Sequence, residues 1–232
     1  MDKIKILLTG GSGTLGKELL KIYNKEEYLF FSPTSLELNI TDYNICTKWF
    51  DDNKIDIIIH AAAYTNVKES EEKYIKSIET NIIGTCNMVK CAEKHNIKLI
   101  YISTDYVFDG EKGNYKISDP INPLTKYAMS KAAGELAVRM YPNSLVIRTS
   151  FYGYTFPYDK ALVDQWSSKD YIDILAPKIL NACLSDRIGI IHVGNKRRSI
   201  YEIAKERKKS VIPFASKDLG LKIPTDTSFE EK

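Results

Sequence analysis

Two side chains with complementary acid–base chemistry stand four residues apart in the stretch YAMSK, namely Tyr127 and Lys131. In a helix, residues at this spacing share one face, so the phenol and the ammonium group lie together. The positive charge favours the phenolate and lowers a phenol pKa from its reference value of about 10 toward the working range of an acid–base catalyst. Upstream, an apolar run ends in STDYVFDG, where the hydroxyl of Thr104 could hold a substrate carbonyl beside the phenol. Tyr and Lys at this spacing are usually two solvated side chains, so the interpretation depends on the rest of the chain.

A second candidate site is the glycine turn near the start of the chain, with Gly10, Gly13 and Gly16 at even spacing. An apolar run, Ile4 to Leu8, precedes it and is typical of a strand buried on both faces of a parallel sheet. Apolar residues at helical spacing follow it, so the turn leads into the N-terminus of an amphipathic helix. Free N–H groups, the helix dipole and the missing Cβ atoms together predict a binding loop for a pyrophosphate.

The elements that must position these residues alternate between strand and helix. Further strand-length apolar runs are YLFF (28–31), IDIIIHAAA (55–63), IKLIYIS (97–103) and SLVIRTS (144–150), and helices are expected at 42–53, 71–96 and 125–141. This order predicts a doubly wound α/β fold, in which a parallel sheet has helices on both faces. Ligands of such sheets bind beyond the carboxyl ends of the strands, so the loops that follow the strands should converge on one crevice.

The composition changes near Tyr152, where the irregular aromatic stretch YGYTFPYDKALVDQW begins. A helix in DYIDILAPKILNACL, a strand in GIIHV and a helix in RSIYEIAKER are expected after it. We therefore predict a dinucleotide-binding, Rossmann-like domain over residues 1–150 and a small substrate-binding module over 151–232.

The composition suits a soluble globular protein, because 44% of the 232 residues are hydrophobic. The net charge of +3 arises from 33 basic and 30 acidic residues spread along the chain, so neither nucleic acid nor a membrane surface is indicated as a partner. No window approaches the roughly 20 apolar residues of a membrane span, and no secretory signal is recognisable, so a cytoplasmic protein is expected. The four cysteines lack metal-ligand spacing; free thiols and no metal site are expected.

From Lys3 to Gly153 the chain resembles extended short-chain dehydrogenase/reductases and, among them, the dTDP-4-dehydrorhamnose reductases, which reduce a nucleotide-linked 4-keto-6-deoxy sugar. The similarity is carried by LLTGGSGTLGKEL, ELNITD, IIIHAAAYTNVKESE, NIIGTCNMVKCAEKHNIKLIYISTDYVFDG, NPLTKYAMSKAAGE and VIRTSFYG. Weaker similarity continues in VDQWSSKDYIDILAPKIL, GIIHVGNKRRSIYEIAKE and PTDTSF. The resemblance implies an NAD(P)-dependent oxidoreductase of deoxysugar biosynthesis, in the pathway of dTDP-rhamnose.

The resemblance also implies a role for each matching residue. Tyr127 would protonate the C4 oxygen as hydride arrives, Lys131 would tune Tyr127 and bind the nicotinamide ribose, and Thr104 would orient the carbonyl. The residues implied to bind the cofactor are Gly10, Ser12, Gly13, Thr14, Leu15 and Gly16 at the pyrophosphate, Asn39 and Ile40 at the adenine, and Ala61, Ala62, Ala63 and Tyr64 at the ribose and nicotinamide.

The substrate side is expected to include Asp105 beside Thr104, the flat side chains of Phe151, Tyr152 and Trp166, and the basic run Lys196, Arg197 and Arg198. The basic run could contact the sugar nucleotide's diphosphate, although an exposed helix start accounts for it equally well.

The cofactor is predicted to be NADPH, with NADH left open. The stretch FFSPTSLE offers Ser32, Thr34 and Ser35 before its first acid, Glu37, so no carboxylate stands near enough in sequence to repel a 2′-phosphate. There is also no Arg to attract that phosphate.

The chain departs from the family pattern in three places: Asn39 replaces a common Asp, the segment between RTSFYG and VDQW is short, and the C-terminal module is abbreviated. Two alternatives therefore stay open, namely a nucleotide-sugar epimerase or dehydratase and a regulatory subunit that binds a dinucleotide without turnover. Dehydratases have Asp-Glu after the strand-end hydroxyl and bifunctional epimerase-reductases have Cys at the position of Tyr106, so simple reduction fits best. A homodimer or a partner enzyme of the same pathway is left open as the assembly.

Overall fold

The central element is a six-stranded parallel sheet in the order β10-β5-β4-β3-β1-β2. The computed structural model describes residues 2–218 and 223–230. The strands of this sheet are β1 (Ile4–Thr9), β2 (Tyr28–Phe31), β3 (Ile57–His60), β4 (Lys98–Thr104), β5 (Ser144–Thr149) and β10 (Gly189–Val193). The chain reverses its direction of winding after β2, so β3 pairs with the other side of β1. The predicted doubly wound α/β fold is confirmed.

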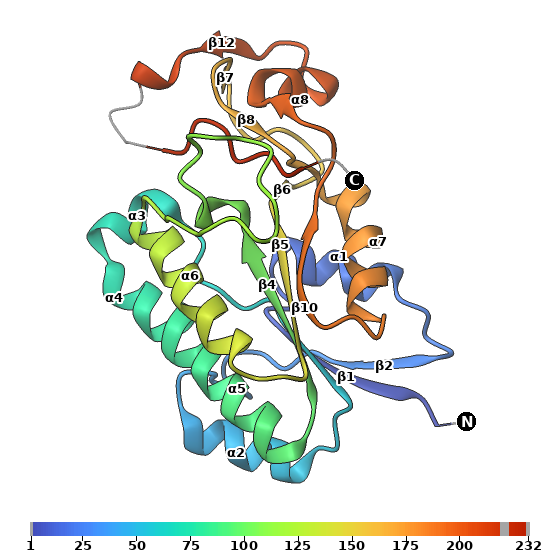
Figure 1. The fold of residues 1–232 in the computed structure, drawn as a ribbon. Helices are drawn as coiled ribbons and strands as arrows, with labels where there is room; N and C mark the ends of the chain where they lie inside the picture. Colours follow the sequence, from blue (N-terminus) through green and yellow to red (C-terminus); the bar gives the residue numbers. More distant parts are fainter. Residues whose placement is uncertain (1, 219–222, 231–232) are drawn as a thin grey trace.

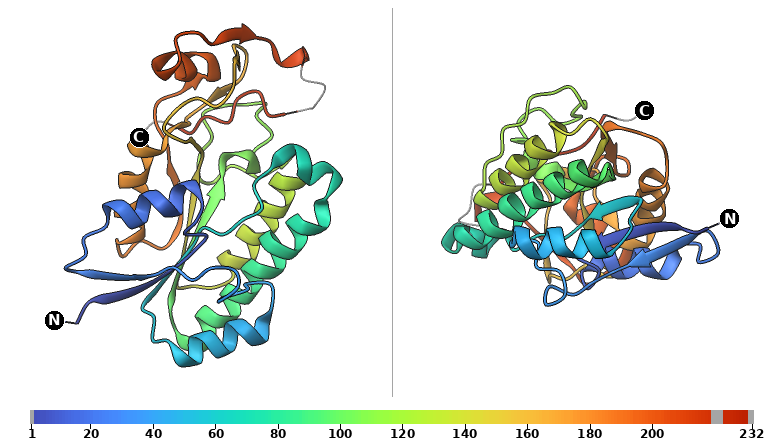
Figure 2. Two further views of the ribbon diagram at one scale, coloured as in Figure 1. Left: turned by 180° about the vertical axis from the view of Figure 1, so that it is seen from behind. Right: turned by 90° about the horizontal axis from the view of Figure 1, so that it is seen from below.

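Helices cover both faces of the sheet (Figure 1 and Figure 2). On one face lie α2 (Tyr43–Asp52), α5 (Gly84–His95) and α6 (Lys126–Arg139), and on the other lie α1 (Thr14–Ile22) and α7 (Ile172–Cys183). Each layer has its own apolar core: Leu19 of α1 and Leu175 of α7 pack on one side, and Phe50 of α2 and Met88 of α5 pack on the other. The four inner strands, β1, β3, β4 and β5, are largely buried between the two cores, which explains their nearly continuous apolar sequences.

The prediction of one helix over 71–96 is wrong, because four elements share this region. The helix α3 (Val67–Glu72) ends near Lys73, α4 (Tyr74–Ser77) follows, and a π-helical segment, η1 (Ile78–Ile83), joins it to α5. Within η1 the buried side chain of Asn81 bonds both the backbone N and O of Tyr64, at 2.7 and 3.0 Å. The local widening of the helix thus places a side-chain amide against the loop after β3, as π-helical turns often do at functional sites.

The last third of the chain contributes to two layers. Its helix α7 and strand β10 complete the main sheet and its core. Its other elements lie beyond the carboxyl ends of the strands, at the top of Figure 1. They are β6 (Phe151–Tyr152), β7 (Lys160–Leu162), β8 (Trp166–Ser167), β9 (Asp170–Tyr171), β11 (Arg198–Ser199), α8 (Ile200–Arg207), β12 (Ile212–Phe214) and η3 (Ser216–Asp218). The short helix η2 (Asp105–Val107), from the preceding part of the chain, lies with them. A division at residue 150 stays a prediction, but the sheet itself does not divide there.

Two buried carboxylates attach this upper layer to the main sheet. Glu18 of α1 accepts a hydrogen bond from the phenol of Tyr154, which follows β6. Asp105, directly after β4, accepts hydrogen bonds from Ser167 at 3.0 Å and from Thr227 at 2.8 Å. No helix within residues 2–218 and 223–230 has the length and hydrophobicity needed to cross a membrane.

Candidate active site

The turn between β1 and α1 requires glycine for two separate reasons. Gly10 has a φ of +76°, and a Cβ there would lie 2.6 Å from the backbone N of Ala62. A Cβ on Gly16 would lie 2.4 Å from the backbone O of Gly10, so the helix could not pack as closely on the strand. Both positions therefore exclude larger residues.

Gly13 serves the same turn differently, because it is the N-cap of α1 and no side chain caps the helix there. A Cβ on Gly13 would have only the carbonyl of Gly10 within 4 Å, at 3.2 Å, so the space above it is open. The first turn of α1 holds no acidic residue, and Thr14 lines the large cleft described below. Uncapped N–H groups at the positive end of a helix, with open space above them, fit the diphosphate of a dinucleotide.

The loops after β2 and β3 lie next to this turn. The amide oxygen of Asn39 accepts bonds from the N and Oγ1 of Thr41, at 3.1 and 2.9 Å, so Asn39 stabilises its own loop. Ile40 is buried in the core below it. After β3, the backbone N of Ala62 donates to Thr9 at 3.3 Å. Adenine contacts by Asn39 and Ile40, and ribose or nicotinamide contacts by the Ala61–Tyr64 segment, stay predictions.

The first acid in the loop after β2, Glu37, is already engaged in hydrogen bonds within that loop. Glu37 accepts hydrogen bonds from the backbone N and the hydroxyl of Thr34, at 2.7 and 2.9 Å, and these bonds lower the pKa of Glu37. Ser32 lies nearer to the glycine turn than Glu37 does. Its hydroxyl is so close to Gly11 that a Cβ on that glycine would collide with it. In NAD-specific sites an acid of this loop faces the ribose 2′-hydroxyl. The loop described here accommodates a 2′-phosphate better, because its Glu37 is already bonded to Thr34.

The three predicted catalytic residues come together at the carboxyl edge of the sheet. Thr104 ends β4, where its hydroxyl caps η2 by accepting from the backbone N of Tyr106 at 3.2 Å. Tyr127 lies in the first turn of α6, which Thr125 caps through the backbone N of Ala128. Lys131 follows one turn later. Thr104, Tyr127 and Lys131 all line one cleft of about 920 Å³.

Burial dominates the acid–base properties of this group. It raises the pKa of Tyr127 to about 12, against a smaller lowering by the Thr104 hydroxyl. It lowers the pKa of Lys131 to about 7. The Lys131 Nζ lies 4.0 Å from the centroid of the Tyr101 ring, a cation–π contact. The predicted lowering of the phenol pKa by Lys131 is wrong: burial raises the pKa of Tyr127, and the cation that lowers it is Lys169.

Lys169 is a cleft residue that the sequence reasoning missed. It stands between β8 and β9, with its Nζ 4.8 Å from the ring centroid of Tyr152 and 5.6 Å from that of Tyr106. Burial lowers its pKa, but Tyr152, Tyr106 and Asp105 outweigh that effect and the net pKa is raised. A single Lys in SSKDYI gives no signal, because only the pairing of β6 with β9 carries it to the cleft.

The residues predicted to bind substrate are divided between the cleft and the interior. Phe151 and Tyr152 line the cleft. The Arg197 guanidinium lies 2.7 Å from the Asp226 carboxylate and over the ring of Trp166, and Arg198 is buried. Because neither Arg lines the cleft in the described part of the chain, diphosphate contacts by Arg197 and Arg198 stay predictions without structural support.

Arg198 and Asp105 have structural contacts instead. Arg198 lies 2.6 Å from the Asp170 carboxylate and also pairs with Glu206. The buried carboxylate of Asp105 is used by Ser167 and Thr227, as described above. These bonds favour a role for both residues in holding the upper layer in place.

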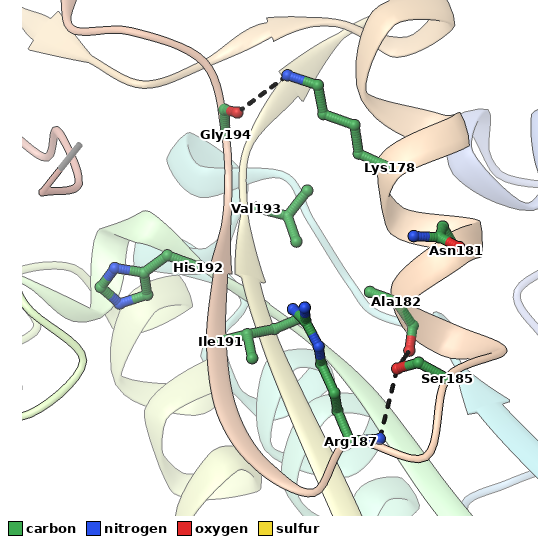
Figure 3. A pocket seen from close by; sticks show the side chains of 9 residues that line it. All are labelled: Lys178, Asn181, Ala182, Ser185, Arg187, Ile191, His192, Val193 and Gly194. Carbon is green, nitrogen blue, oxygen red and sulfur yellow. Dashed lines mark hydrogen bonds between the residues drawn. The ribbon is translucent and has the colours of Figure 1, made fainter. Parts of the chain in front are cut away.

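A second pocket, of about 310 Å³, lies between α7 and β10 on a different side of the molecule (Figure 3). It is lined by polar groups that include Asn181 and Arg187, and the ammonium of Lys178 reaches the carbonyl of Gly194 at 3.5 Å. The side chain of His192 points away from α7 in this view. None of the predicted catalytic or cofactor-binding residues lines this pocket, so the large cleft is the candidate active site.

The fold and the cleft together define the architecture of the short-chain dehydrogenases/reductases, in which a glycine turn and a Thr-Tyr-Lys group meet at one edge of a doubly wound sheet. The chain belongs to the RmlD substrate binding domain family, whose model matches residues 4–175.

Named relatives agree with this assignment. A dTDP-4-dehydrorhamnose reductase of Aggregatibacter actinomycetemcomitans is 35% identical over 182 residues, 75% of this chain and 61% of that relative. The chain thus spans about three fifths of that relative's length. The spore coat polysaccharide biosynthesis protein SpsK of Bacillus subtilis is 32% identical over 82% of this chain and 73% of its own length. The crystal structure of a Bacillus anthracis dTDP-4-dehydrorhamnose reductase in complex with NADP superimposes with a TM-score of 0.91, at 29% identity, over 100% of this chain and 92% of that one.

Proposed function

We propose that the protein is an NADPH-dependent reductase that converts the C4 ketone of a nucleotide-linked 4-keto-6-deoxy sugar to an alcohol, in deoxysugar biosynthesis. The observation that carries this proposal is the meeting of Thr104, Tyr127 and Lys131 in one cleft that also reaches Thr14 at the glycine turn. The likeness to dTDP-4-dehydrorhamnose reductases, one of them a complex with NADP, supports the choice of substrate and cofactor.

When bound, NADPH supplies the hydride. The N–H groups at the start of α1 would hold its diphosphate, and the loop after β2, which begins with Ser32, would accept its 2′-phosphate. Thr104 donates a hydrogen bond that orients the sugar ketone. Tyr127 transfers its phenolic proton to the C4 oxygen, which leaves a C4 hydroxyl and a phenolate. Lys131, in its charged form, binds the nicotinamide ribose and stabilises that phenolate.

A coupled absorbance assay tests this function. Purified protein is mixed with NADPH and a dTDP-linked 4-keto-6-deoxyhexose, and oxidation of the cofactor is followed with the sugar product analysed by chromatography. NADH in place of NADPH should give a lower kcat/KM. Absence of any sugar reduction by folded protein that binds NADPH would contradict the proposal.

The regulatory alternative makes a different prediction in the same assay, namely cofactor binding without turnover. The intact Thr104, Tyr127 and Lys131 group favours the enzyme. An epimerase would cause no net oxidation of the cofactor, so the absorbance trace and the product analysis together separate it from a reductase.

The setting of the enzyme is also part of the proposal. A cytoplasmic location is supported by the four cysteines, which are free thiols, three of them buried. A nucleotide sugar is the expected small-molecule partner, and a homodimer or a second enzyme of the pathway remains the expected protein partner. Chromatography with light scattering, with and without cofactor, measures the assembly.

A further inference from the structure

The fully buried carboxylate of Glu135 lies one helical turn beyond Lys131 in α6. Tyr127, Lys131 and Glu135 follow one another at intervals of four residues, so they share the face of α6 that packs on the sheet. Side chains at this spacing are neighbours on a helix, and an acid and a base there attract each other. The two predicted catalytic side chains of α6 are therefore continued by a buried negative charge.

Two strands of the sheet hold this carboxylate. Arg148 of β5, which is 1% exposed, places its Nη2 2.7 Å from one carboxylate oxygen of Glu135. Ser103 of β4 donates to the other oxygen at 2.8 Å. A second arginine, Arg139 of α6, places its Nη1 3.8 Å from the Glu135 carboxylate at the solvent side. The Nε2 of His192, in β10, lies 3.4 Å from Nη1 of Arg148. Glu135 thus joins α6 to the carboxyl ends of β4 and β5.

Two other neighbours of Lys131, on β4 and β3, carry no charge at neutral pH. Tyr101 of β4 offers its ring face to the ammonium and donates its hydroxyl to the Lys131 carbonyl at 3.2 Å. His60 of β3 is held by Thr9 and Thr85, and burial, together with the charge of Lys131, lowers its pKa to about 3. Within the part of the chain that the structure describes, Glu135 supplies the opposite charge that acts on Lys131.

We propose that Glu135 is a positioning residue of this site: its carboxylate keeps the buried Lys131 ammonium charged, while its bonds to Arg148 and Ser103 fix α6 against β4 and β5. This inference rests on the proposed function, because it assigns Lys131 a role only in its charged form.

The pKa of Lys131 supports the same conclusion. Burial brings it down to about 7, and Glu135 acts in the opposite direction. Because this pKa is close to neutral pH, a small change in the surroundings of Lys131 decides whether the side chain is charged. Loss of the Glu135 charge moves the pKa lower, so that most of the Lys131 side chains become neutral amines in neutral solution.

The test measures the titration of Lys131 directly, in protein whose lysines are isotope-labelled at Cε. The nuclear magnetic resonance signal that titrates near pH 7 and is absent from Lys131→Met belongs to Lys131. In Glu135→Gln, which keeps the side-chain shape, the midpoint of this titration should move to lower pH. Ser103→Ala removes a bond to the same carboxylate but keeps its charge, so its midpoint should stay near that of the parent. A parental midpoint in folded Glu135→Gln would overturn the proposal.

Glu135→Gln leaves Arg148 without its ion pair and could fail to fold. In that case the double variant Glu135→Gln with Arg148→Met removes both charges together. Its Lys131 midpoint should again move to lower pH, because the field acting on Lys131 comes from Glu135, and an unmoved or raised midpoint would count against the proposal. Neither measurement requires sugar turnover, so this inference can fail while the proposed reductase activity stands, and the reverse.

Discussion

At the scale of single residues, burial shifts the pKa of the site's acid and the pKa of its base in opposite directions. Burial holds the phenol of Tyr127 as the neutral acid, with its pKa raised to about 12. The same burial disfavours the ammonium form of Lys131 and lowers its pKa to about 7, so its charge changes near neutral pH. In reduction, the neutral phenol is the form that can give up a proton. The stabilisation of the resulting phenolate then depends on cations in the cleft, and Lys169 lowers the pKa of Tyr127 as well.

The first prediction concerns the proton donor. Tyr127→Phe keeps the ring and removes the hydroxyl, so kcat should fall by roughly 10²–10⁴-fold, the usual contribution of general acid catalysis. Affinity for NADPH, measured by fluorescence titration, should remain close to that of the parent. Tyr141→Phe removes another buried phenol beyond the same helix and should leave kcat nearly unchanged. A near-parental kcat in Tyr127→Phe would favour the regulatory alternative.

The second prediction concerns pH. Lys131 is charged below its pKa of about 7 and neutral above it. If the charged form binds the cofactor ribose, the dissociation constant of the cofactor should increase as the pH rises through 7. NADH is the better probe, because the 2′-phosphate of NADPH titrates in the same range. The dependence should disappear in Lys131→Met, and an equal pH dependence in that variant would assign it to another group.

At the scale of elements, α1 and its turn separate two uses of glycine. Gly16 allows the helix to contact the strand, whereas Gly13 leaves room for a ligand. Gly10 is required for two further reasons: its φ is positive, and the absence of a Cβ makes room for the backbone of Ala62.

The third prediction uses this contrast. Gly13→Val should fold with a Tm near that of the parent but lose NADPH binding, because its side chain occupies the space above the helix start. Gly16→Val should lower the Tm, because its Cβ would collide with the Gly10 carbonyl. Calorimetry and cofactor titration on the same samples distinguish the two. Parental binding by Gly13→Val would show that the diphosphate binds elsewhere.

The fourth prediction concerns the start of β11, where Arg197 precedes the strand, Arg198 begins it, and the two differ in burial. Arg198→Ala leaves the buried Asp170 carboxylate without its partner, and breaking a buried pair in this way costs about 3–5 kcal/mol. The Arg197 side chain is 35% exposed, so Arg197→Ala should cost at most about 1 kcal/mol for its ion pair. Urea denaturation measures both. A larger loss in Arg197→Ala, or an increase of KM for the sugar without loss of stability in Arg198→Ala, would restore the diphosphate interpretation.

The same elements show what the sequence could and could not predict. The strands of the main sheet and α6 were predictable, because apolar runs of four or more residues and helical spacing are signals that a single stretch of sequence carries. The upper layer was not, since strands such as β6, β8 and β9 have two residues each and form only through long-range pairing. The π-helical η1 was missed for a similar reason, because it depends on the contact of Asn81 with Tyr64. Lys169 and the ion pairs of Arg197 and Arg198 belong to this unpredictable part.

At the scale of the whole molecule, the short C-terminal part closes the crevice from above while it depends on the main sheet for its attachment. Asp105 receives Ser167 and Thr227 immediately beside Thr104, so the chain's last described segment is fixed at the catalytic edge. The abbreviated sequence therefore still supplies one side of the cleft, through residues such as Tyr158, Lys160 and Phe214.

The bond between Tyr154 and Glu18 has a thermodynamic consequence. It links α1, whose N-terminus is the proposed diphosphate site, to the segment between Tyr152 and Phe156, two residues that line the proposed substrate cleft. Suppose that bound cofactor improves the affinity for the sugar by a certain factor. By thermodynamic linkage, bound sugar must then improve the affinity for the cofactor by the same factor. Tyr154→Phe, which cuts this connection and touches neither ligand, should reduce both factors equally toward one when the four dissociation constants are measured by calorimetry. Undiminished cooperativity in that variant would mean that the two ligands communicate only through their direct contact in the cleft.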